Sequence, residues 1–213
     1  MGQLINKFSK SIHRGSRALS IMEEIRGFAE ERLKGDRVSG PDHSERVYRW
    51  CEVLARAEGG GDLEILRAAS LLHDVAVPIV GRARHYEEGA RIAREFLAGK
   101  GIPRDRVEAI AHAIEAHSRF GGPEPKTLEA KILYDADLLD FIGAIGIVRA
   151  IGRGLLSGEF DGDVGKAPEF LRGVFERYAT KLHTKKAQEI ARGRLDFMRE
   201  FVERLREELA LER

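Results

Sequence analysis

The 213-residue sequence has few cysteines, few aromatic residues and no long apolar run, and each shortage excludes a class of protein. Cys51 is the only cysteine, so no disulfide can form within the chain and no cysteine-rich zinc site is available. A reducing, intracellular setting fits this shortage, and we expect a cytoplasmic protein. The longest apolar runs are far too short to cross a bilayer, so we expect no membrane partner.

The sequence also has no large excess of positive or negative charge. It has 36 Lys and Arg residues and 35 Asp and Glu residues, which gives a formal net charge of +1. No global electrostatic field therefore attracts the chain to nucleic acid. Aromatic residues make up 7% of the chain, and no expected helix shows a basic stripe interleaved with them. These features argue against nucleic acid as the main partner. The glycine run "EGGGD" is not followed by Lys-Ser or Lys-Thr, so it is no phosphate-binding loop.

Residues 1–19 form a basic N-terminal extension. It lacks the apolar central block of a secretory signal, and Asn6 stands where a myristoylation signal has Ser or Thr. We expect a tail that is mobile or docked on a partner. Residues 20–213 show helical periodicity almost throughout, few strand signals and no linker between two cores. They are predicted to form a single all-α domain.

Glycine, proline and capping residues divide this domain into helices. Asp62 is expected to cap the third helix and Thr127 the sixth. The glycine-rich segment 153–168 is expected to be the main loop, followed by two closing helices, the last from about residue 185. The first six helices are predicted over residues 20–34, 41–58, 63–77, 85–99, 103–118 and 128–151.

Ionisable residues interrupt the apolar faces of three of these helices. His43 lies on the stripe of Val47, the pair His73-Asp74 ends the apolar run "AASLL", and Asp137 shares a face with apolar neighbours. Two imidazoles and two carboxylates on inner faces are costly to bury unless a cation joins them. Nitrogen and oxygen ligands without thiolate suit Mn²⁺, Fe²⁺, Mg²⁺ or Zn²⁺. A buried His–Asp network that only tightens the bundle is the structural alternative.

The ordered set "DHSERVYRW", "AASLLHDVA", "HYEEGARIAREFL", "VEAIAHAIEAHS", "LEAKILYDADLLDFIGAIGIVRA" and "RGRLDFMREF" resembles the HD-domain superfamily of metal-dependent phosphohydrolases. It is most similar to small stand-alone members called predicted HD hydrolases, some of which are nucleotide pyrophosphohydrolases. The resemblance covers roughly residues 40 to 205. It implies an HD-domain-like helical bundle with a metal-site core over about residues 40–151 and a C-terminal helical extension. The implied ligands of one divalent metal are His43, His73, Asp74 and Asp137.

The resemblance also implies hydrolysis of a phosphoester or phosphoanhydride bond, in a small phosphorylated substrate that we expect to be a nucleotide. A pyrophosphohydrolase is the preferred type, with attack by a metal-activated water. Mn²⁺ is the favoured ion, with Mg²⁺, Fe²⁺, Co²⁺, Ni²⁺ and Zn²⁺ as alternatives. A homo-oligomer is possible. Two other readings stay open: a non-catalytic module that binds metal and nucleotide for regulation, and a helical scaffold with structural histidines.

Further polar residues are candidates for the same site. His117, at a helix end, is expected to contact substrate or to protonate the leaving group beside Asp74. Asp135 and Asp140 flank Asp137 and are expected to support the ligands from behind. These residues also have alternative roles. His112 and His117 together are candidates for holding a second metal. The alternative for Arg46 is an ion pair with an acidic residue, and for Lys181 and Arg194 it is a position on a solvated face. The candidates for substrate binding are Arg46, His85, His112, Lys181 and Arg194.

Overall fold

The computed structural model describes residues 20–119, 121–178 and 181–211, so the predicted N-terminal extension lies outside the described residues. Every regular element in the described part of the chain is a helix, which confirms the all-α prediction. Residues 20–32 are helical. The elements that follow are α2 (Pro41–Glu58), α3 (Leu63–Leu72), α4 (Val77–Val80), α5 (His85–Gly99), α6 (Arg104–Ala116), α7 (Leu128–Leu139), α8 (Gly143–Ser157), the 3-10 turn η1 (Val164–Lys166), α9 (Ala167–Tyr178) and α10 (Lys185–Leu209).

The expected capping residues begin their helices as predicted. The Asp62 carboxylate accepts hydrogen bonds from the amides of Glu64 and Ile65, and the Thr127 hydroxyl accepts one from Ala130. Each bond satisfies an amide that the first turn of a helix leaves without a partner. The two caps fix where α3 and α7 start, and the ends of these helices carry the residues of the candidate site.

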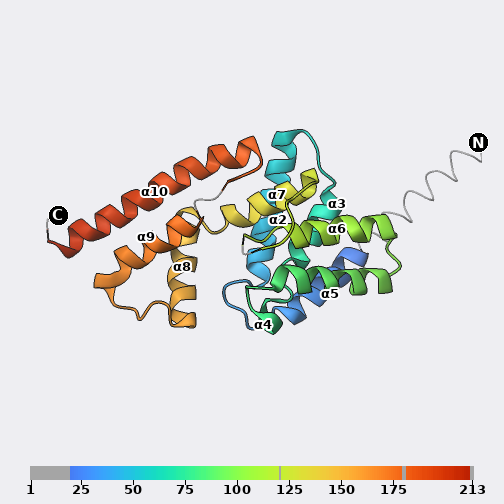
Figure 1. The fold of residues 1–213 in the computed structure, drawn as a ribbon, viewed down its shortest axis with the longest axis horizontal. Helices are drawn as coiled ribbons and strands as arrows, with labels where there is room; N and C mark the ends of the chain where they lie inside the picture. The colour runs from blue at the N-terminus through green and yellow to red at the C-terminus, as the bar shows by residue number, and fades with distance from the viewer. Residues whose placement is uncertain (1–19, 120, 179–180, 212–213) are drawn as a thin grey trace, which may run out of the picture.

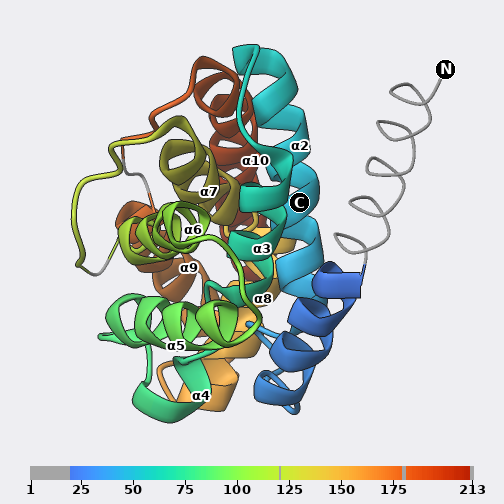
Figure 2. The same cartoon turned by 90° about the vertical axis from the view of Figure 1, so that its right-hand side faces the viewer.

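Helices α2 to α7 gather into one cluster, and α8, α9 and α10 extend from it to the other end of the molecule (Figure 1). Within the cluster α5 packs on α6, α2 packs on α3 and α7, and α3 packs on α6. The long helix α10 begins beside α2 and α7 and then packs on α8 and α9. The end-on view in Figure 2 shows the cluster helices stacked around a common interior. This arrangement matches a helical bundle with a C-terminal helical extension.

The predicted helix over residues 128–151 is two helices, α7 and α8, and this is a correction. The amides of Asp140 and Phe141 bond to carbonyls three residues back and close α7, after which Ile142 is extended. Gly143 then takes a φ of +79°, and a Cβ there would lie 3.1 Å from Arg194. Glycine is the residue that adopts this conformation without strain.

A second correction concerns the segment 153–168, which was expected to be a loop. Helix α8 continues through Gly152 and Gly154 to Ser157, and α9 begins at Ala167. A Cβ at Gly154 would lie 2.5 Å from the Phe170 ring, so this glycine permits α8 to approach α9. Its role is close packing and not chain reversal. The turn expected around Pro78 contains one short helix, α4.

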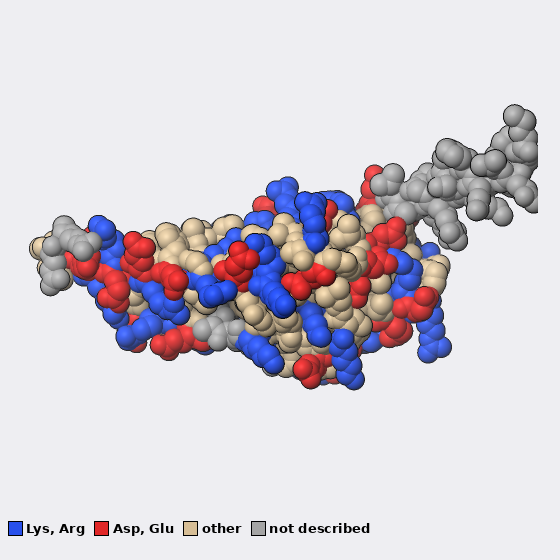
Figure 3. All heavy atoms as spheres, turned by 90° about the horizontal axis from the view of Figure 1, so that it is seen from above, with Lys and Arg blue, Asp and Glu red and all other residues tan. Residues whose placement is uncertain are grey.

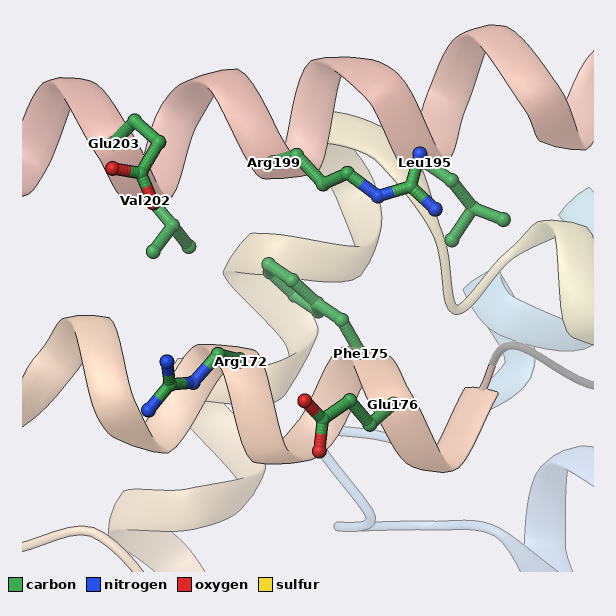
Figure 4. Close-up of a pocket in the computed structure, with 7 residues that line it drawn as sticks. All are labelled: Arg172, Phe175, Glu176, Leu195, Arg199, Val202 and Glu203. Carbon is green, nitrogen blue, oxygen red and sulfur yellow. The ribbon is translucent and has the colours of Figure 1, made fainter.

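A hollow of about 290 Å³ lies between α9 and α10. Figure 4 shows the Phe175 ring directed from α9 into this space, with Leu195 and Val202 on the α10 side. Charged side chains, among them Arg172 and Arg199, line the remainder. This lining includes none of the candidate site residues.

Lys and Arg side chains are intermixed with Asp and Glu over the face shown in Figure 3, as the formal net charge of +1 leads one to expect. Many of these charges pair within one helix, as Arg91 does with Glu88 and Glu95. Exposed pairs of this kind contribute little to stability. Among the described residues, no helix is long and apolar enough to cross a membrane.

The packing of α2 against α3 predicts the reactivity of the single cysteine. Cys51 is fully buried beside Ser70, and burial raises the pKa of its thiol to about 12. Since the thiolate is the reactive form, we expect Cys51 of the folded protein to resist a disulfide reagent at mildly alkaline pH and to react at once in denaturant. Absorbance of the released thiol follows both reactions. Rapid labelling of the folded protein would contradict the packing.

Candidate metal centre

The four expected metal ligands meet where α2, the end of α3 and α7 come together. His43 Nε2 lies 3.2 Å from His73 Nε2 and 3.1 Å from Asp137 Oδ1. Asp74 Oδ2 lies 3.8 Å from His43 Nε2 and 3.6 Å from His73 Nε2. No member of this group is more than 6% exposed. The structure therefore brings these four side chains into one buried cluster.

A second pair of imidazoles lies on the other side of Asp74. His85 begins α5 and His117 follows the last residue of α6, and their Nε2 atoms are 3.1 Å apart. Asp74 Oδ1 is 3.4 Å from His85 Nε2 and 3.9 Å from His117 Nε2. Both residues are buried. Asp74 thus directs one carboxylate oxygen toward each pair of imidazoles, and each half of the cluster can hold a metal ion.

The other ring nitrogen of each histidine has a fixed partner. In three of them Nδ1 donates a hydrogen bond to a backbone carbonyl, which can only accept. His43 Nδ1 lies 2.8 Å from Asp140 Oδ2 and 2.5 Å from Arg149 Nη1. Since Nδ1 carries the proton in the other three histidines, each of these neutral rings presents a lone pair at Nε2. The carbonyl partners are Ser70 for His73 at 2.7 Å, Arg82 for His85 at 2.6 Å and Ile114 for His117.

Burial keeps the rings of His73, His85 and His117 neutral near pH 7. It lowers the pKa of His73, and it lowers the pKa of His85 and of His117 to about 4. The Nε2 lone pairs of His85 and His117 therefore face each other across 3.1 Å and also face the Asp74 carboxylate. No proton is available to join them, so the arrangement is repulsive unless a cation lies between them.

The donor set fits a divalent ion. Ligand atoms that bind one ion at ~2.1 Å lie about 3 Å apart when they subtend a right angle and up to about 4 Å apart at wider angles. The three separations among His43 Nε2, His73 Nε2 and Asp137 Oδ1 are 3.1, 3.2 and 3.9 Å. Asp137 Oδ1 is buried and makes no hydrogen bond in the described part of the chain. A buried carboxylate oxygen with no donor is costly, and a metal ion would satisfy it.

Asp140 supports His43 from behind. It accepts from His43 Nδ1, from Arg46 through Nε at 2.8 Å and Nη2 at 3.0 Å, and from Arg149 Nη1. Although burial opposes ionisation, the hydrogen bonds from His43 and Arg46 lower the pKa of Asp140 to about 2. Arg149 also donates to the carbonyl of Val38 at 2.7 Å. The structure therefore places Asp140 against His43 Nδ1 and pairs Arg46 with an acidic side chain.

The structure places Asp135 on a different face of α7. Its carboxylate accepts from the amides of His183 and Thr184, at 3.0 and 2.7 Å, and from the Thr184 hydroxyl at 2.7 Å. Thr184 is the residue that caps α10. Asp135 therefore anchors the start of α10, and none of its hydrogen bonds in the described residues goes to a member of the cluster.

Three candidates for substrate binding lie away from the cluster. His112 is partly exposed and accepts a hydrogen bond from the Lys126 amide, because a helix turns it away from His117. Lys181 is exposed on the segment before α10. Arg194 donates to the Leu139 carbonyl and its guanidinium carbon lies 4.4 Å from the centre of the Trp50 ring, so it fastens α10 to the end of α7.

Sequence reasoning missed three arginines beside the cluster, namely Arg82, Arg119 and Arg149. Arg119 Nη1 lies 3.6 Å from Asp137 Oδ2, and Arg149 holds Asp140. The position of Arg119, two residues after His117, was the available signal. Arg149 had none, because it was placed within a continuous helix that would have carried it away from the site.

Comparison with known proteins identifies the family. Residues 41–142 match the family model "HD domain". YpgQ, an uncharacterised protein of Bacillus subtilis strain 168, is 31% identical over 202 residues, which are 88% of this chain and 93% of YpgQ. The chain belongs to the HD superfamily. It is thus of the general kind of metal-dependent phosphohydrolases, and its His–Asp cluster is suited to the divalent metal that HD domains bind.

Solved structures share the fold over nearly the whole chain. A protein from Lactobacillus plantarum is 28% identical with a TM-score of 0.72, covering 89% of this chain and 97% of that one. A predicted HD superfamily hydrolase from an uncultured Thermotogales bacterium is 29% identical with a TM-score of 0.63, covering 88% and 92%. Bacillus subtilis YpgQ in complex with ADP is 26% identical with a TM-score of 0.67, covering 90% and 96%.

The hydrogen bonds of Asp135 predict a loss of stability without a loss of metal binding. Asp135→Ala removes the acceptor of two amides and a hydroxyl, so we expect the free energy of unfolding to fall by about 2–4 kcal/mol. Urea denaturation measures the fall, and calorimetric titration with Mn²⁺ measures metal affinity. A large loss of affinity in a folded variant would instead place Asp135 behind the metal ligands.

The facing lone pairs predict that divalent metal stabilises the protein. At a free concentration of about 100 times Kd, bound Mn²⁺ adds about 2.7 kcal/mol per site, which raises Tm by roughly 5–10 °C. We expect about two ions per chain, and about one in the double variant His85→Ala/His117→Ala. Metal analysis after desalting gives the stoichiometry. His112→Ala is the matched control on α6, and an unchanged Tm with chelator or metal would contradict a metal centre.

Proposed function

We propose that this protein is a divalent-metal-dependent hydrolase of phosphoester or phosphoanhydride bonds in nucleotides, with a pyrophosphohydrolase as the preferred type. The observation that carries the proposal is the position of Asp74, whose two oxygens each face a pair of buried imidazoles. Burying several nitrogen and oxygen acceptors without hydrogen-bond donors between them destabilises a fold. A bound cation would satisfy these acceptors, whereas apolar packing would not.

The residues divide into two ligand groups in this proposal. His43, His73, Asp74 and Asp137 hold one divalent ion, with Mn²⁺ favoured. Asp74, His85 and His117 hold a second. When bound, such ions lower the pKa of water toward neutrality and neutralise phosphoryl oxygens as charge develops.

The proposed role of His117 changes from proton donor to ligand. Its Nδ1 proton is engaged by the Ile114 carbonyl, and its Nε2 lone pair faces Asp74 and His85. A ring in that state has no proton to give at Nε2. His85 has the same arrangement, so both are proposed to bind metal and not substrate.

Asp140 is the residue that prepares His43 for this role. By accepting the Nδ1 proton it fixes the tautomer and raises the basicity of Nε2, as carboxylates commonly do behind metal-binding histidines. Arg46 and Arg149 hold the Asp140 carboxylate in place. They act on the metal ligands through Asp140, and Arg46 is therefore proposed as a positioning residue.

The nucleotide is the less direct part of the proposal. It is supported by the structure of YpgQ with ADP, because YpgQ shares the fold over 90% of this chain. The preference for pyrophosphate release is based on the family resemblance. A cytoplasmic location, a homo-oligomer and Mn²⁺ as the physiological ion stay predictions. Exposed apolar side chains on α8, such as Val148 and Leu156, are a surface that an oligomer would use.

Metal-dependent turnover tests the proposal. With Mn²⁺, Mg²⁺ or Co²⁺, we expect release of pyrophosphate or phosphate from at least one nucleotide in a panel of nucleoside mono-, di- and triphosphates. Asp74→Ala should lower the rate by more than ~100-fold, since changing residues that only support ligands costs about 10–100-fold. Circular dichroism confirms matched helicity, and His112→Ala should retain turnover.

The same experiment separates the regulatory module from the enzyme. Saturable nucleotide binding that needs metal, with no product formed by wild-type protein, would establish the module and end the proposal of catalysis. Turnover that is equal in wild type and Asp74→Ala would show a contaminating activity.

A further inference from the structure

Three arginines from separate parts of the chain surround one phenylalanine ring next to the metal cluster. The guanidinium carbons of Arg149, Arg119 and Arg82 lie 3.9, 5.2 and 5.9 Å from the centre of the Phe141 ring. The ring itself is buried and packs edge-on against His43 at 5.6 Å between centroids. The three cations are therefore gathered at one edge of the cluster.

Attraction to the ring does not account for this gathering. A cation over an aromatic face gains ~0.5–2 kcal/mol, and one ring does not neutralise three like charges. Two of the arginines have carboxylate neighbours: Arg149 donates to Asp140, and Arg119 Nη1 is 3.6 Å from Asp137 Oδ2. The three guanidinium groups repel one another, and their partial burial strengthens this repulsion. Further negative charge near them would offset it.

Arg82 lies in this group without such a neighbour. It is half-buried and donates to the Ser39 hydroxyl at 2.5 Å, and among the described residues no carboxylate lies within 4.0 Å of its guanidinium. At longer range, the positive charge of Arg82 helps to lower the pKa of Asp74. Asp74 and Asp137 are also the proposed metal ligands, so a bound cation would take much of the negative charge that Arg82 and Arg119 now face.

The charges around the cluster do not balance. Four guanidinium groups face three buried carboxylates. Each divalent ion adds two further positive charges. A single phosphate group is too small a counter-charge for this excess, whereas a chain of phosphates matches it. The charged groups are Arg46, Arg82, Arg119 and Arg149 on one side and Asp74, Asp137 and Asp140 on the other.

We propose that Arg82 and Arg119 form an anion subsite that binds the phosphate groups of the substrate beyond the one at the metal cluster. The inference rests on the proposed function and narrows it: the substrate class is an ester with two or more linked phosphates, not a monophosphate. Arg149 is not part of the subsite, because its two terminal nitrogens are engaged by Asp140 and by the Val38 carbonyl.

Binding of two base-free probes that cannot be hydrolysed tests the subsite directly. Methylenediphosphonate carries two linked phosphonates and methylphosphonate carries one. Calorimetric titration in excess Mn²⁺ compares wild type with Arg82→Gln and Arg119→Gln. We expect each variant to bind the diphosphonate about 10- to 100-fold more weakly, as loss of a charge-assisted hydrogen bond does, with methylphosphonate changed less than about threefold.

Matched variants keep the result interpretable. Arg84→Gln is the control, because Arg84 lies two residues from Arg82 but is exposed and pairs with Glu87. Arg82→Lys and Arg119→Lys retain charge and should restore part of the affinity, and they replace a glutamine variant that fails to fold. Wild-type affinity for the diphosphonate in both glutamine variants, or an equal loss for both probes, would overturn the subsite.

Failure of the subsite is distinguishable from failure of the proposed function. If wild-type protein hydrolyses monophosphate esters with metal but gains nothing from a second phosphonate, the subsite is wrong and the hydrolase stands. If the diphosphonate binds through Arg82 and Arg119 while no nucleotide is hydrolysed, the subsite stands and the proposal of catalysis fails.

Discussion

The buried Asp74 carboxylate between two pairs of buried imidazoles is the interaction on which the rest of the site depends. Each carboxylate oxygen lies within 4 Å of two imidazole Nε2 atoms. In a core of apolar helices such a group is costly, so the fold is arranged around what satisfies it. Divalent cations are the groups that satisfy nitrogen and oxygen donors together.

Helix ends make this arrangement possible. His73 and His117 each lie at the residue that ends a helix, and each donates from Nδ1 to the carbonyl three residues before it. The last carbonyls of a helix have no partner within the helix, so they are free to fix an imidazole. The same bond that satisfies the backbone therefore selects the tautomer and directs Nε2 inward. Asp62 contributes to the same arrangement, because it caps the start of α3, the helix that His73 ends.

Local patterns in the sequence were enough for most of the fold and for bringing His43, His73, Asp74 and Asp137 forward as the proposed first ligand group. Helix caps such as Asp62 and Thr127 depend only on neighbours within one helix. The same is true of the apolar stripe that contains His43 and Val47. Local sequence patterns can therefore detect both. The pairing of His85 with His117 involves two helix ends 32 residues apart, which no local pattern connects. Resemblance to a family supplied the order of the ligands, not the second pair.

The break between α7 and α8 shows most clearly why the remainder escaped prediction. In a continuous helix Arg149 would lie nine residues from Asp140, about 13 Å along the axis, and no contact would be possible. The turn at Gly143 redirects α8 across the axis of α7, and Arg149 reaches Asp140 and packs on Phe141. Apolar periodicity continues through the break and hides it. One glycine with a positive φ thus connects backbone geometry to the positioning of His43, and to the arginines that surround Phe141.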